Sequence, residues 1–481
     1  MKVAIVAEYY PRADDPVSGI WAHRQAVAVR DLGVEVRVLV LHRPLPPLAA
    51  VRSRDAGALA RALRQPTRAA LDGIDIRYVR YLSPPRPWSY GSWGLWAAPA
   101  LAIALHRLRR EFPFDLVHAH YAVPAGDAVR RIAPGIPLVV SVHGGDVYAT
   151  SARLVGARAV RGTLAHARLV LANSAGTARR SAEHGARTTR VVHLGAELPP
   201  GPSAPPPRES TPAAPNHRPP ASSAPAELAM EAAQPLPPPA ELAMEAAQPL
   251  PPPAELAMEA AQPLPPPAAN HRPPASSAPA ELARESTPVD FPSPSPTPTL
   301  VTVGHLVPRK RHAEVIAALA RLGTRHPDLR YVIVGDGPER ERLEGLARSL
   351  GVADRVELRG QLPPDQAAAC AREATLFVLP SADEAFGVAY VEAMAGGVPA
   401  IGCRGEDGPE EIAAAGGGMV LVPCGDVVAL AAQIDALLRD SDRRAVLGRA
   451  AAATVREAFT WEQCGRETMA AYREAVQIFD V

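Results

Sequence analysis

Short apolar runs of strand length alternate with amphipathic stretches through the first 198 residues. The runs are KVAIVAE, VEVRVLVL, DLVHAH, PLVVSVHG and RLVLANS. A helical pattern lies around residues 20–32, and helical periodicity follows each of the later runs. Continuous apolar runs are typical of strands buried on both faces. Their alternation with helices predicts βαβ units, and hence a parallel sheet with helices on both faces.

The last part of the chain repeats this pattern. Ala- and Leu-rich helical stretches separate six further runs, TLVTVG, RYVIVGDG, RVELRG, ATLFVLPS, VPAIGC and MVLVP. We therefore predict an α/β protein with two doubly wound, Rossmann-like parallel-sheet domains, residues 1–198 and 299–458. Residues 459–481 are predicted to form a separate C-terminal helix. Ligands of such sheets bind beyond the carboxyl ends of the strands.

A Pro- and Ala-rich segment, residues 199–298, separates the two parts. AELAMEAAQPLPPP occurs three times in it without change, and NHRPPASSAPAELA occurs twice. Units so rich in proline cannot stack into a core, so we predict a disordered linker with polyproline II character. An inert spacer is favoured over a binding role for PLPPP.

Composition narrows the protein class. The four cysteines lie in the last quarter without a C-x-x-C motif or a pairing pattern, which indicates a reduced, cytoplasmic protein without structural zinc. The first apolar run ends too early for a signal peptide. No run reaches the roughly 18 apolar residues of a membrane-spanning helix.

Charge is distributed unevenly although the net charge is only +1. Residues 1–198 carry 27 basic and 14 acidic side chains, a surplus of 13. This surplus favours an anionic partner or the inner face of a membrane. The segment GSWGLWAAPALAIALHRLRRE (91–111) could form an interfacial helix, but we prefer a core helix with a solvated basic end.

Lysine is rare in this chain. Among 51 basic residues only Lys2 and Lys310 are lysines, and Lys310 follows Arg309 where an apolar run gives way to a helical pattern. A surface lysine at this turn could be there by chance, and this explanation is about as good as a chemical one. The chemical interpretation is that a flexible ammonium and the free N–H groups of a helix start hold a phosphate. The next run ends in Gly335, Asp336 and Gly337, a turn that would let the backbone approach a ligand.

Two glutamates eight residues apart flank a Phe-Gly pair in LFVLPSADEAFGVAYVEAMAGGVPAIG (376–402). Glu384 is predicted in the loop after a buried strand, and Glu392 about one turn into the following helix. Two solvated surface glutamates are the plain alternative. A glutamate within so apolar a segment needs a polar partner to be buried, and the hydroxyl pair of a ligand is suitable because a carboxylate accepts two hydrogen bonds.

These segments together resemble the retaining nucleotide-sugar glycosyltransferases of family 4, which have the two-domain GT-B fold. In that family an E-x7-E segment with F-G between its glutamates follows a strand ending in L-P-S. VGHLVPRKR resembles the diphosphate-binding segment, and VIVGDGPE matches a further family segment. In the first domain, SGIWAHRQAVAV resembles the Gly-containing loop beside the acceptor, and GIPLVVSVHGGDV resembles the strand and turn facing the donor sugar. The likeness covers nearly the whole chain outside the insert.

The resemblance implies roles for individual residues. Lys310, with Arg309 beside it, would neutralise the donor diphosphate, and Glu392 would hold the ribose hydroxyls. Glu384 and His143 would lie at the donor sugar. The remaining donor contacts would come from Gly19, Gly304, His305, Phe386, Gly387 and Val388. The segment FTWEQCGRETMAAYREAV resembles the family helix that crosses back onto the first domain.

Three departures from the family pattern affect this assignment. His305 stands where the family usually has arginine, so one phosphate cation is weakened or replaced by Arg309. Ala385 replaces the usual glycine before Phe386 and would narrow the donor pocket. The insert stands where family members have a short linker.

Metal chemistry is not expected. The histidines of HAH (118–120) share one strand face without an evident third ligand, so a structural or acceptor-side role is favoured. His143 has an ordinary turn histidine as its alternative interpretation. No D-x-D motif occurs in a metal-like setting, and we expect neither a metal nor a cofactor, the nucleotide sugar being a substrate.

The predicted function is retaining transfer of a sugar from a nucleotide-diphosphate sugar to a hydroxyl acceptor. The sequence does not decide whether the acceptor is a glycan, a lipid-linked molecule or a small molecule, including an anionic one. It also does not decide whether the protein associates peripherally with a membrane. A nucleic-acid partner is not expected. The rivals are a sugar-nucleotide epimerase or hydrolase of the same architecture, which should need extra carboxylates, and a non-catalytic sugar-nucleotide-binding scaffold.

Deleting residues 205–290 is expected to leave fold and activity largely intact. Exact Pro-rich repeats cannot bury a core, and the entropy of loop closure grows only with the logarithm of loop length. Thermal unfolding and donor turnover of the shortened chain, compared with a chain lacking one repeat (residues 240–253), measure the effect. A shortened chain that unfolds would show that the repeats are structural.

Overall fold

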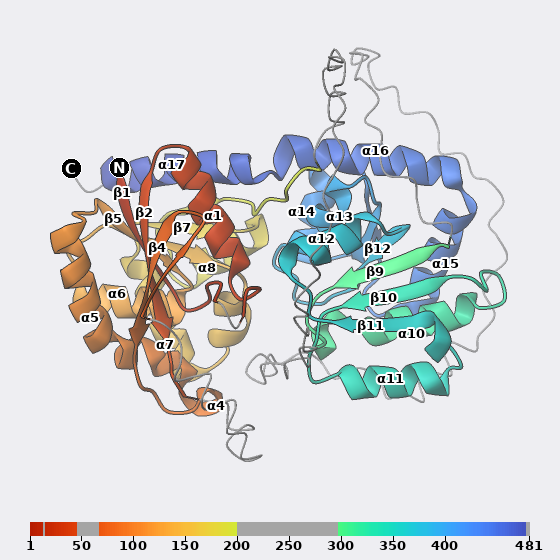
Figure 1. The fold of residues 1–481 in the computed structure, drawn as a ribbon, viewed down its shortest axis with the longest axis horizontal. Coiled ribbons are helices and arrows are strands. Elements are labelled where there is room, and N and C mark those ends of the chain that lie inside the picture. The colour runs from red at the N-terminus through yellow and green to blue at the C-terminus, as the bar shows by residue number, and fades with distance from the viewer. Residues whose placement is uncertain (13–14, 46–66, 200–296, 478–481) are drawn as a thin grey trace, which may run out of the picture.

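The computed structural model describes residues 1–12, 15–45, 67–199 and 297–477 (Figure 1). Nearly all of the Pro-rich segment, with the disorder predicted for it, lies outside these residues. The described residues form two α/β units, each built on one sheet, and two long helices run along both units (Figure 1). The predicted class of two doubly wound parallel-sheet domains is confirmed, whereas the numerical domain limits remain predictions.

The first sheet has eight strands in the order β3-β4-β2-β1-β5-β6-β7-β8. Its central strands are buried along almost their whole length, which accounts for the continuous apolar runs in the sequence. The strands are β1 (Lys2–Ala7), β2 (Glu35–His42), β3 (Arg68–Leu71), β4 (Ile74–Arg80), β5 (Leu116–His120), β6 (Leu138–Val142), β7 (Leu169–Ala172) and β8 (Thr189–Val191).

One edge of this sheet differs from the prediction. β3 and β4, which the apolar pattern did not predict, form an antiparallel hairpin. Asp72 and Gly73 connect them with φ of 46° and 75°, the left-handed backbone that favours an Asp-Gly turn. The Asp-Gly pair between apolar residues was the sequence signal for this hairpin. The sheet is therefore parallel except at this edge.

Helices cover both faces of the first sheet. α5 and α7 pack on one face, against side chains such as Ala4 and Val6 of β1. α1 packs on the other face, against Val3 and Ile5. The helical segments are α1 (Ile20–Asp31), α4 (Arg86–Ser89), η1 (Tyr90–Ser92), α5 (Trp93–Glu111), η2 (Ala122–Gly126), α6 (Asp127–Ile132), η3 (Asp146–Thr150), α7 (Leu154–His166) and α8 (Ala175–Glu183).

The second sheet contains the six predicted strands in the order β11-β10-β9-β12-β13-β14, all parallel. They are β9 (Thr299–Val303), β10 (Arg330–Val334), β11 (Val356–Gly360), β12 (Leu376–Val378), β13 (Ala400–Cys403) and β14 (Met419–Val422). The helical segments around them are η4 (Pro308–Lys310), α10 (His312–Leu322), α11 (Arg340–Ser349), η5 (Ala353–Arg355), α12 (Pro364–Arg372), α13 (Val388–Ala395), α14 (Asp407–Ala415), α15 (Val427–Arg439) and α16 (Ser441–Ala458).

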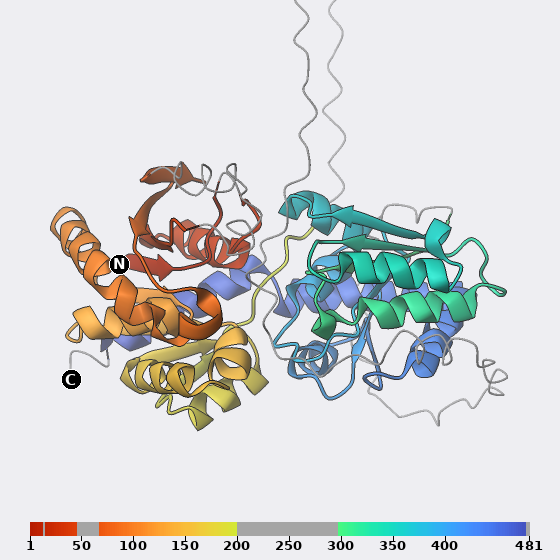
Figure 2. The same cartoon turned by 90° about the horizontal axis from the view of Figure 1, so that it is seen from below.

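The last helix, α17 (Trp461–Gln477), packs on the first unit although it follows the second in sequence. It lies beside α1, where the Gln25 amide donates to the Thr468 hydroxyl at 2.7 Å (Figures 1 and 2). A Cβ atom at Gly465 would lie 2.8 Å from the Ala28 carbonyl oxygen, so glycine permits the close approach. The Tyr472 hydroxyl lies 2.7 Å from Nδ1 of His118. α17 therefore completes the core on this face of the first sheet.

Within the described residues, no helix combines the length and the apolar character that crossing a membrane requires.

Replacing Tyr472 by phenylalanine is expected to destabilise the protein by about 1–3 kcal/mol, because Nδ1 of the buried His118 loses its partner. Burial lowers the pKa of His118 to about 3, so the ring is neutral and needs that hydrogen bond. Chemical denaturation measures the loss. Arg473→Ala, at an exposed position of the same helix, should change stability by less than about 0.5 kcal/mol. Equal stability of Tyr472→Phe and the wild type would contradict the assignment.

Candidate functional site

Lys310 lies in the turn between β9 and α10, at the carboxyl edge of the second sheet. The strands β9, β10 and β11 point toward the first unit at this edge (Figure 1). The Lys310 side chain passes Gly304, since a Cβ atom there would lie 3.7 Å from its Cε. Its Nζ donates to Oε2 of Glu384 at 2.6 Å. The rare lysine thus ends in an ion pair at the place where the sequence predicts an anion.

Glu384 is almost completely buried, with 7% of its surface exposed. It lies in the loop between β12 and α13, and its Oε2 accepts from Lys310 and, at 2.7 Å, from the Ser381 hydroxyl. Its backbone N–H donates to Oε2 of Glu406 at 3.0 Å. Burial raises the pKa of Glu384, but the charges of Lys310 and Arg309 outweigh it and hold the pKa below its ordinary value. The buried carboxylate therefore stays ionised.

The neighbours of Lys310 contribute unequally. The Arg309 carbonyl accepts the N–H of Ala382 at 2.8 Å, which joins the β9–α10 turn to the Glu384 loop, and its guanidinium charge acts on Glu384. The His305 carbonyl accepts from the ring of His312 at 3.2 Å and from the N–H of Val307 at 2.9 Å. Desolvation and the nearby charge of Lys310 lower the pKa of the His305 ring, so the ring is neutral at neutral pH. Arg309 is therefore the second cation near the Lys310–Glu384 pair.

The glycines after β10 make room for a neighbouring turn, and the approach of their backbone to a ligand stays a prediction. A Cβ atom at Gly335 would lie 2.0 Å from the Gly304 carbonyl oxygen, and one at Gly337 would lie 2.5 Å from that of Leu306. Both glycines thus make room for the backbone of the β9–α10 turn. Chain packing explains their presence, and they support the segment that carries Lys310.

The segment between the two glutamates has one buried side chain and a helix start. Phe386 is buried and its ring stacks on His193 of the first unit at 5.5 Å between centroids. Gly387 has φ of 89°, and α13 begins directly after it at Val388. The first N–H groups of a helix have no carbonyl partner within the helix. The backbone here is thus arranged for an anion or a hydroxyl oxygen, while the Phe386 side chain packs against the other unit.

Glu392 lies one turn into α13, as predicted, but does not join Glu384. It borders a separate cavity of about 200 Å³ between the two units, whose lining includes Trp21 and Trp461. Among the described residues no hydrogen bond or ion pair reaches its carboxylate. Burial raises the pKa of Glu392 to about 7, although Arg372 and Arg24 oppose the rise. The two glutamates therefore have different surroundings and different protonation.

Charged residues of both units close this cavity. Arg24 of α1 pairs with Glu197 and, at 3.1 Å, with Asp365 of α12. Nε1 of Trp21 is buried without a hydrogen-bond partner among the described residues. The cavity thus has the Trp21 side chain on its wall and, at Glu392, a carboxyl without a partner among the described residues, which suits a ligand hydroxyl.

Gly19 begins the helix that carries Trp21 and Arg24. Its φ is 66°, and a Cβ atom would lie 2.2 Å from the carbonyl carbon of Tyr9, just beyond β1. Only glycine therefore fits where the β1 loop meets the start of α1. Gly19 sets the position of that helix start, and Ile20 and Trp21 border the cavity of Glu392.

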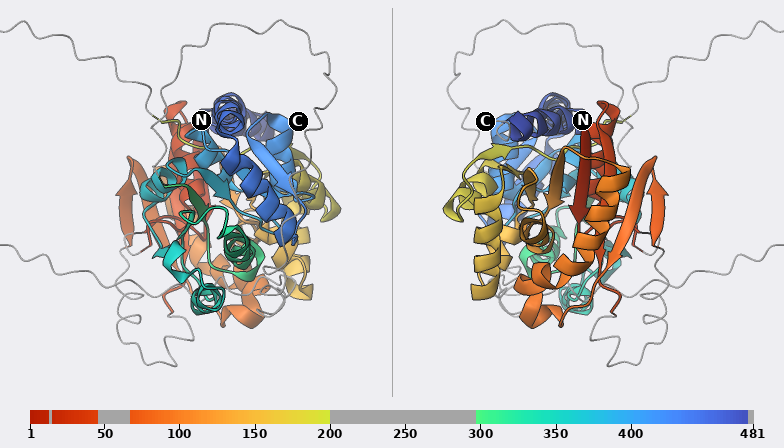
Figure 3. Two further views of the ribbon diagram at one scale, coloured as in Figure 1. Left: turned by 90° about the vertical axis from the view of Figure 1, so that its right-hand side faces the viewer. Right: turned by 90° about the vertical axis from the view of Figure 1, so that its left-hand side faces the viewer.

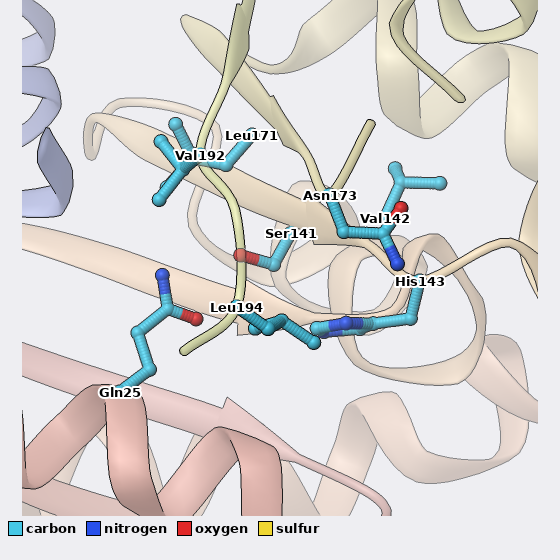
Figure 4. Close-up of a pocket in the computed structure, with 8 residues that line it drawn as sticks. All are labelled: Gln25, Ser141, Val142, His143, Leu171, Asn173, Val192 and Leu194. Atoms are coloured by element: carbon cyan, nitrogen blue, oxygen red, sulfur yellow. The ribbon is translucent and has the colours of Figure 1, made fainter. Parts of the chain in front are cut away.

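His143 directly follows β6 and lies among aromatic rings of the first unit. Its Nε2 lies 3.1 Å from Nδ1 of His120, and its ring centroid lies 6.0 Å from that of Trp21. Figure 4 shows His143 beside Gln25 and Asn173 around a cavity of about 10 Å³, no larger than one water molecule occupies. Burial lowers the pKa of His143 to about 3. His143 is thus a neutral residue that borders a small space lined by both polar and apolar side chains.

The histidines of HAH are structural within the described residues. His118 lies between the hydroxyls of Tyr472 and Ser141, both at 2.7 Å, and His120 contacts His143. No three His, Cys, Asp or Glu side chains in the described ranges are arranged to hold a metal ion. The structural or acceptor-side role favoured for this motif stays a prediction.

The two units touch beside the candidate residues. A Cβ atom at Gly144, next to His143, would lie 2.6 Å from the Cβ of Ala385, next to Glu384. The Tyr148 hydroxyl donates to Oδ2 of Asp407 at 2.6 Å, and Nε2 of His193 lies 2.6 Å from Oε1 of Glu411. Ala385, where the family usually has glycine, therefore faces the His-Gly-Gly-Asp turn.

The structure brings Lys310, Arg309, Gly304 and Glu384 together at one edge of the second sheet. The other predicted site residues lie apart from this group, around the junction of the two units. Sequence reasoning missed Ser381, Glu406, Trp21 and Arg24, which contact or surround the two glutamates. Ser381 lay within the quoted L-P-S segment and was open to prediction. No local signal marks Glu406, which reaches the loop from 22 positions away.

Two protein-family models match the chain. The model described as Glycosyltransferase Family 4 matches residues 19–198, and the model described as Glycosyl transferases group 1 matches residues 283–454. The two matches together cover both units.

Curated relatives match part of the chain. A GDP-mannose-dependent alpha-(1-6)-phosphatidylinositol monomannoside mannosyltransferase of Mycolicibacterium smegmatis is 34% identical over 190 residues, 37% of this chain and 50% of the relative. A D-inositol 3-phosphate glycosyltransferase of Salinispora tropica is 36% identical over 196 residues, 36% of this chain and 38% of the relative. The chain thus spans half or less of the length of these relatives.

Solved structures share the whole fold at low identity. Sucrose-phosphate synthase from Thermosynechococcus elongatus has a TM-score of 0.65 at 18% identity, covering 100% of this chain and 99% of its own. Anabaena HepE in complex with UDP-glucose has a TM-score of 0.57 at 17% identity, covering 98% of this chain and 99% of its own. These similarities establish a GT-B fold.

Replacing Glu392 by glutamine is expected to stabilise the ligand-free protein at pH 8 and to leave it nearly unchanged at pH 5. A carboxyl whose pKa is about 7 in the folded state and about 4.3 when unfolded binds its proton more tightly when folded. Stability therefore falls as pH rises through this window, by about 4 kcal/mol at most.

The difference in unfolding free energy between Glu392→Gln and the wild type, measured from pH 4 to 8, isolates this contribution from that of other carboxyls. The exposed Glu341 of α11 provides the control variant Glu341→Gln. A difference that is independent of pH would contradict the raised pKa.

Proposed function

We propose that this chain, which belongs to the glycosyltransferases of the GT-B fold, transfers a sugar from a nucleotide-diphosphate sugar to a hydroxyl acceptor with retention of anomeric configuration. The observation that carries the proposal is the Lys310 ammonium, placed at the carboxyl edge of the second sheet and paired with the buried Glu384. Cations at this edge suit an anionic leaving group.

Lys310 and Arg309 would act on the leaving group. When the bond between the anomeric carbon and the diphosphate oxygen breaks, its electron pair stays on the diphosphate, which gains negative charge. Two cations near that oxygen stabilise the charge more in the transition state than in the intact donor, and this difference lowers the barrier. Positive charge from side chains fulfils this role without a metal ion.

Glu384 would hold Lys310 ready before the donor arrives. An ammonium has three N–H donors, so Lys310 can keep its bond to Oε2 of Glu384 while donating to a phosphate oxygen. Because the pKa of Glu384 is held below its ordinary value, the carboxylate is ionised at neutral pH and can accept a hydroxyl of the donor sugar.

Glu392 would bind the ribose in the cavity between the units. Its carboxylate and the Trp21 N–H both lack partners among the described residues, and a ribose hydroxyl pair would satisfy them. Hydrogen bonds donated to the carboxylate favour its ionised form. Ribose binding is therefore expected to lower the pKa of Glu392 from about 7.

The acceptor would bind on the first unit, between the Gly19 loop and His143. In this proposal its hydroxyl attacks from the face that the diphosphate leaves, and a phosphate oxygen of the donor takes its proton. His143 would orient the sugar as a neutral ring, since its pKa of about 3 excludes a cationic role at neutral pH.

The two units would have to separate for the donor to enter. The cavity at Glu392 is about 200 Å³, whereas clefts for ligands of this size measure roughly 300–1,000 Å³. The contacts of Ala385 with Gly144 and of Tyr148 with Asp407 join the two units. We propose that they open for binding and re-form around the donor.

The acceptor remains a glycan, a lipid-linked molecule or a small molecule, including an anionic one, and we propose action at the inner face of a membrane for the lipid-linked case. Neither an epimerase nor a non-catalytic scaffold is favoured, because both family models describe glycosyltransferases. A thermal-shift screen that includes UDP-glucose, bound by HepE, and GDP-mannose, on which the similar mannosyltransferase depends, would identify the donor, since a bound donor stabilises the folded state.

Lys310→Ala is expected to lower turnover of that donor by about 10²–10³-fold, because one charge on the leaving group is no longer neutralised. Lys2→Ala removes the only other lysine, which is half-buried at the start of β1 in the first unit, and should leave turnover unchanged. Release of nucleoside diphosphate, with and without an acceptor, measures both transfer and hydrolysis. Near-normal turnover of Lys310→Ala would refute the assigned role.

Glu384→Gln distinguishes the role of Glu384 from that of Lys310. With the carboxylate neutralised, Lys310 keeps its full charge for the phosphates, so affinity for nucleoside diphosphate should hold or rise while turnover falls. A parallel loss of affinity in both variants would indicate that the pair is structural.

A further inference from the structure

Large apolar side chains are exposed at the starts of two neighbouring helices of the first unit. Leu95 and Trp96 belong to the first turn of α5, and Leu154 and Val155 to the first turn of α7; between 48% and 71% of each side chain's surface is exposed. Ile103, two turns further along α5, is exposed to 58%. Apolar side chains gathered in this way on a protein surface mark an interaction site.

These two helix starts are in contact. The segment η1, which leads directly into α5, packs on the first turn of α7, since a Cβ atom at Gly91 would lie 2.5 Å from the backbone nitrogen of Gly156. α5 lies on the side of the first unit that is turned away from the second unit (Figures 1 and 3). The exposed side chains are therefore accessible to a large partner.

Unpaired arginines accompany the apolar side chains. Arg107 and Arg110 in the last turns of α5 and Arg158 on α7 are exposed. No carboxylate of the described residues forms an ion pair with any of the three. A protein partner would supply carboxylates at fixed positions. A row of apolar residues with tryptophan, flanked by unpaired arginines, matches instead a surface that is apolar inside and uniformly anionic at its boundary.

We propose that this face, formed by Leu95, Trp96, Ile103, Leu154 and Val155 with Arg107, Arg110 and Arg158, docks on an anionic lipid bilayer. The apolar side chains would enter the headgroup boundary, and the arginines would lie against lipid phosphates. No spanning segment is involved. α5 would lie along the bilayer with its buried side still packed on the first sheet.

The position of this face bears on the proposed reaction. α5 and α7 follow β4 and β6 in sequence, so both begin near the carboxyl edge of the first sheet, where β6 ends beside His143. A hydroxyl acceptor held in the same bilayer would thus stand near the proposed acceptor side. This last step rests on the proposed function, whereas docking on the bilayer does not.

Vesicle sedimentation of the full chain, without donor or acceptor, tests the proposal. The chain should bind vesicles of phosphatidylcholine mixed with phosphatidylglycerol and remain unbound with phosphatidylcholine alone, and salt should weaken the binding. Trp96→Ser combined with Val155→Ser should lower partition by about tenfold or more. Arg107→Gln combined with Arg110→Gln should remove much of the dependence on anionic lipid.

Val446→Ser provides the matched control, because Val446 is exposed to 56% on α16 of the second unit. Its partition should equal that of the wild type, and thermal unfolding of all variants checks that they are folded. Absent vesicle binding, or binding unaffected by the Trp96 and Val155 changes, overturns the proposal. So does concentration-dependent self-association abolished by those changes, which would identify a second copy as the occupant. Donor hydrolysis assayed in solution is independent of all these outcomes.

Discussion

A buried ion pair, Lys310 with Glu384, organises the carboxyl edge of the second sheet. Each charge alone would be costly to bury, and pairing offsets that cost without an evident gain in stability. The pair links the turn after β9 to the loop after β12, and Glu406 adds the loop after β13 through the N–H of Glu384. Three loops are thus joined through one residue, Glu384. Apolar packing would hold them together as well, so the retained charges are better explained by an anionic ligand.

The same loop also joins the two units. Ala385 follows Glu384 and meets Gly144, which follows His143; Phe386 comes next and stacks on His193. Glu384 therefore takes part in the ion pair, while the next two residues in sequence contact the first unit. A movement of the units changes the surroundings of Glu384 directly, which is why we tie entry of the donor to their separation.

The chain's path across the two units has an energetic reason. α17 buries Cys464, Thr468 and Tyr472 on the face of the first sheet that also carries α1, so the first unit is not complete until the last helix is in place. The opposite face is covered by α5 and α7, whose outer sides remain exposed. The first sheet thus has one face closed by the end of the chain and another whose helices are available to a partner.

The sequence by itself determined the architecture. Runs of buried-strand length separated by helical periodicity led to six strands of the second sheet and five of the first, because a parallel sheet buried on both faces requires continuous apolar residues. Short edge strands such as β3 and β8 do not need continuous apolar residues, and the apolar pattern did not predict them. Motif resemblance also brought Lys310, Arg309 and Glu384 into one site, since each follows a strand that ends at the same edge.

Only the tertiary structure decided what those side chains contact. Glu384 and Glu392 share one motif, yet one is held ionised by Lys310 while burial raises the pKa of the other to about 7. Spacing along a chain does not fix burial or the distance to a charge, and these set a pKa. Gly335 and Gly337, Glu406 and the partners of α17 were likewise decided by contacts between segments far apart in sequence, which no local pattern contains.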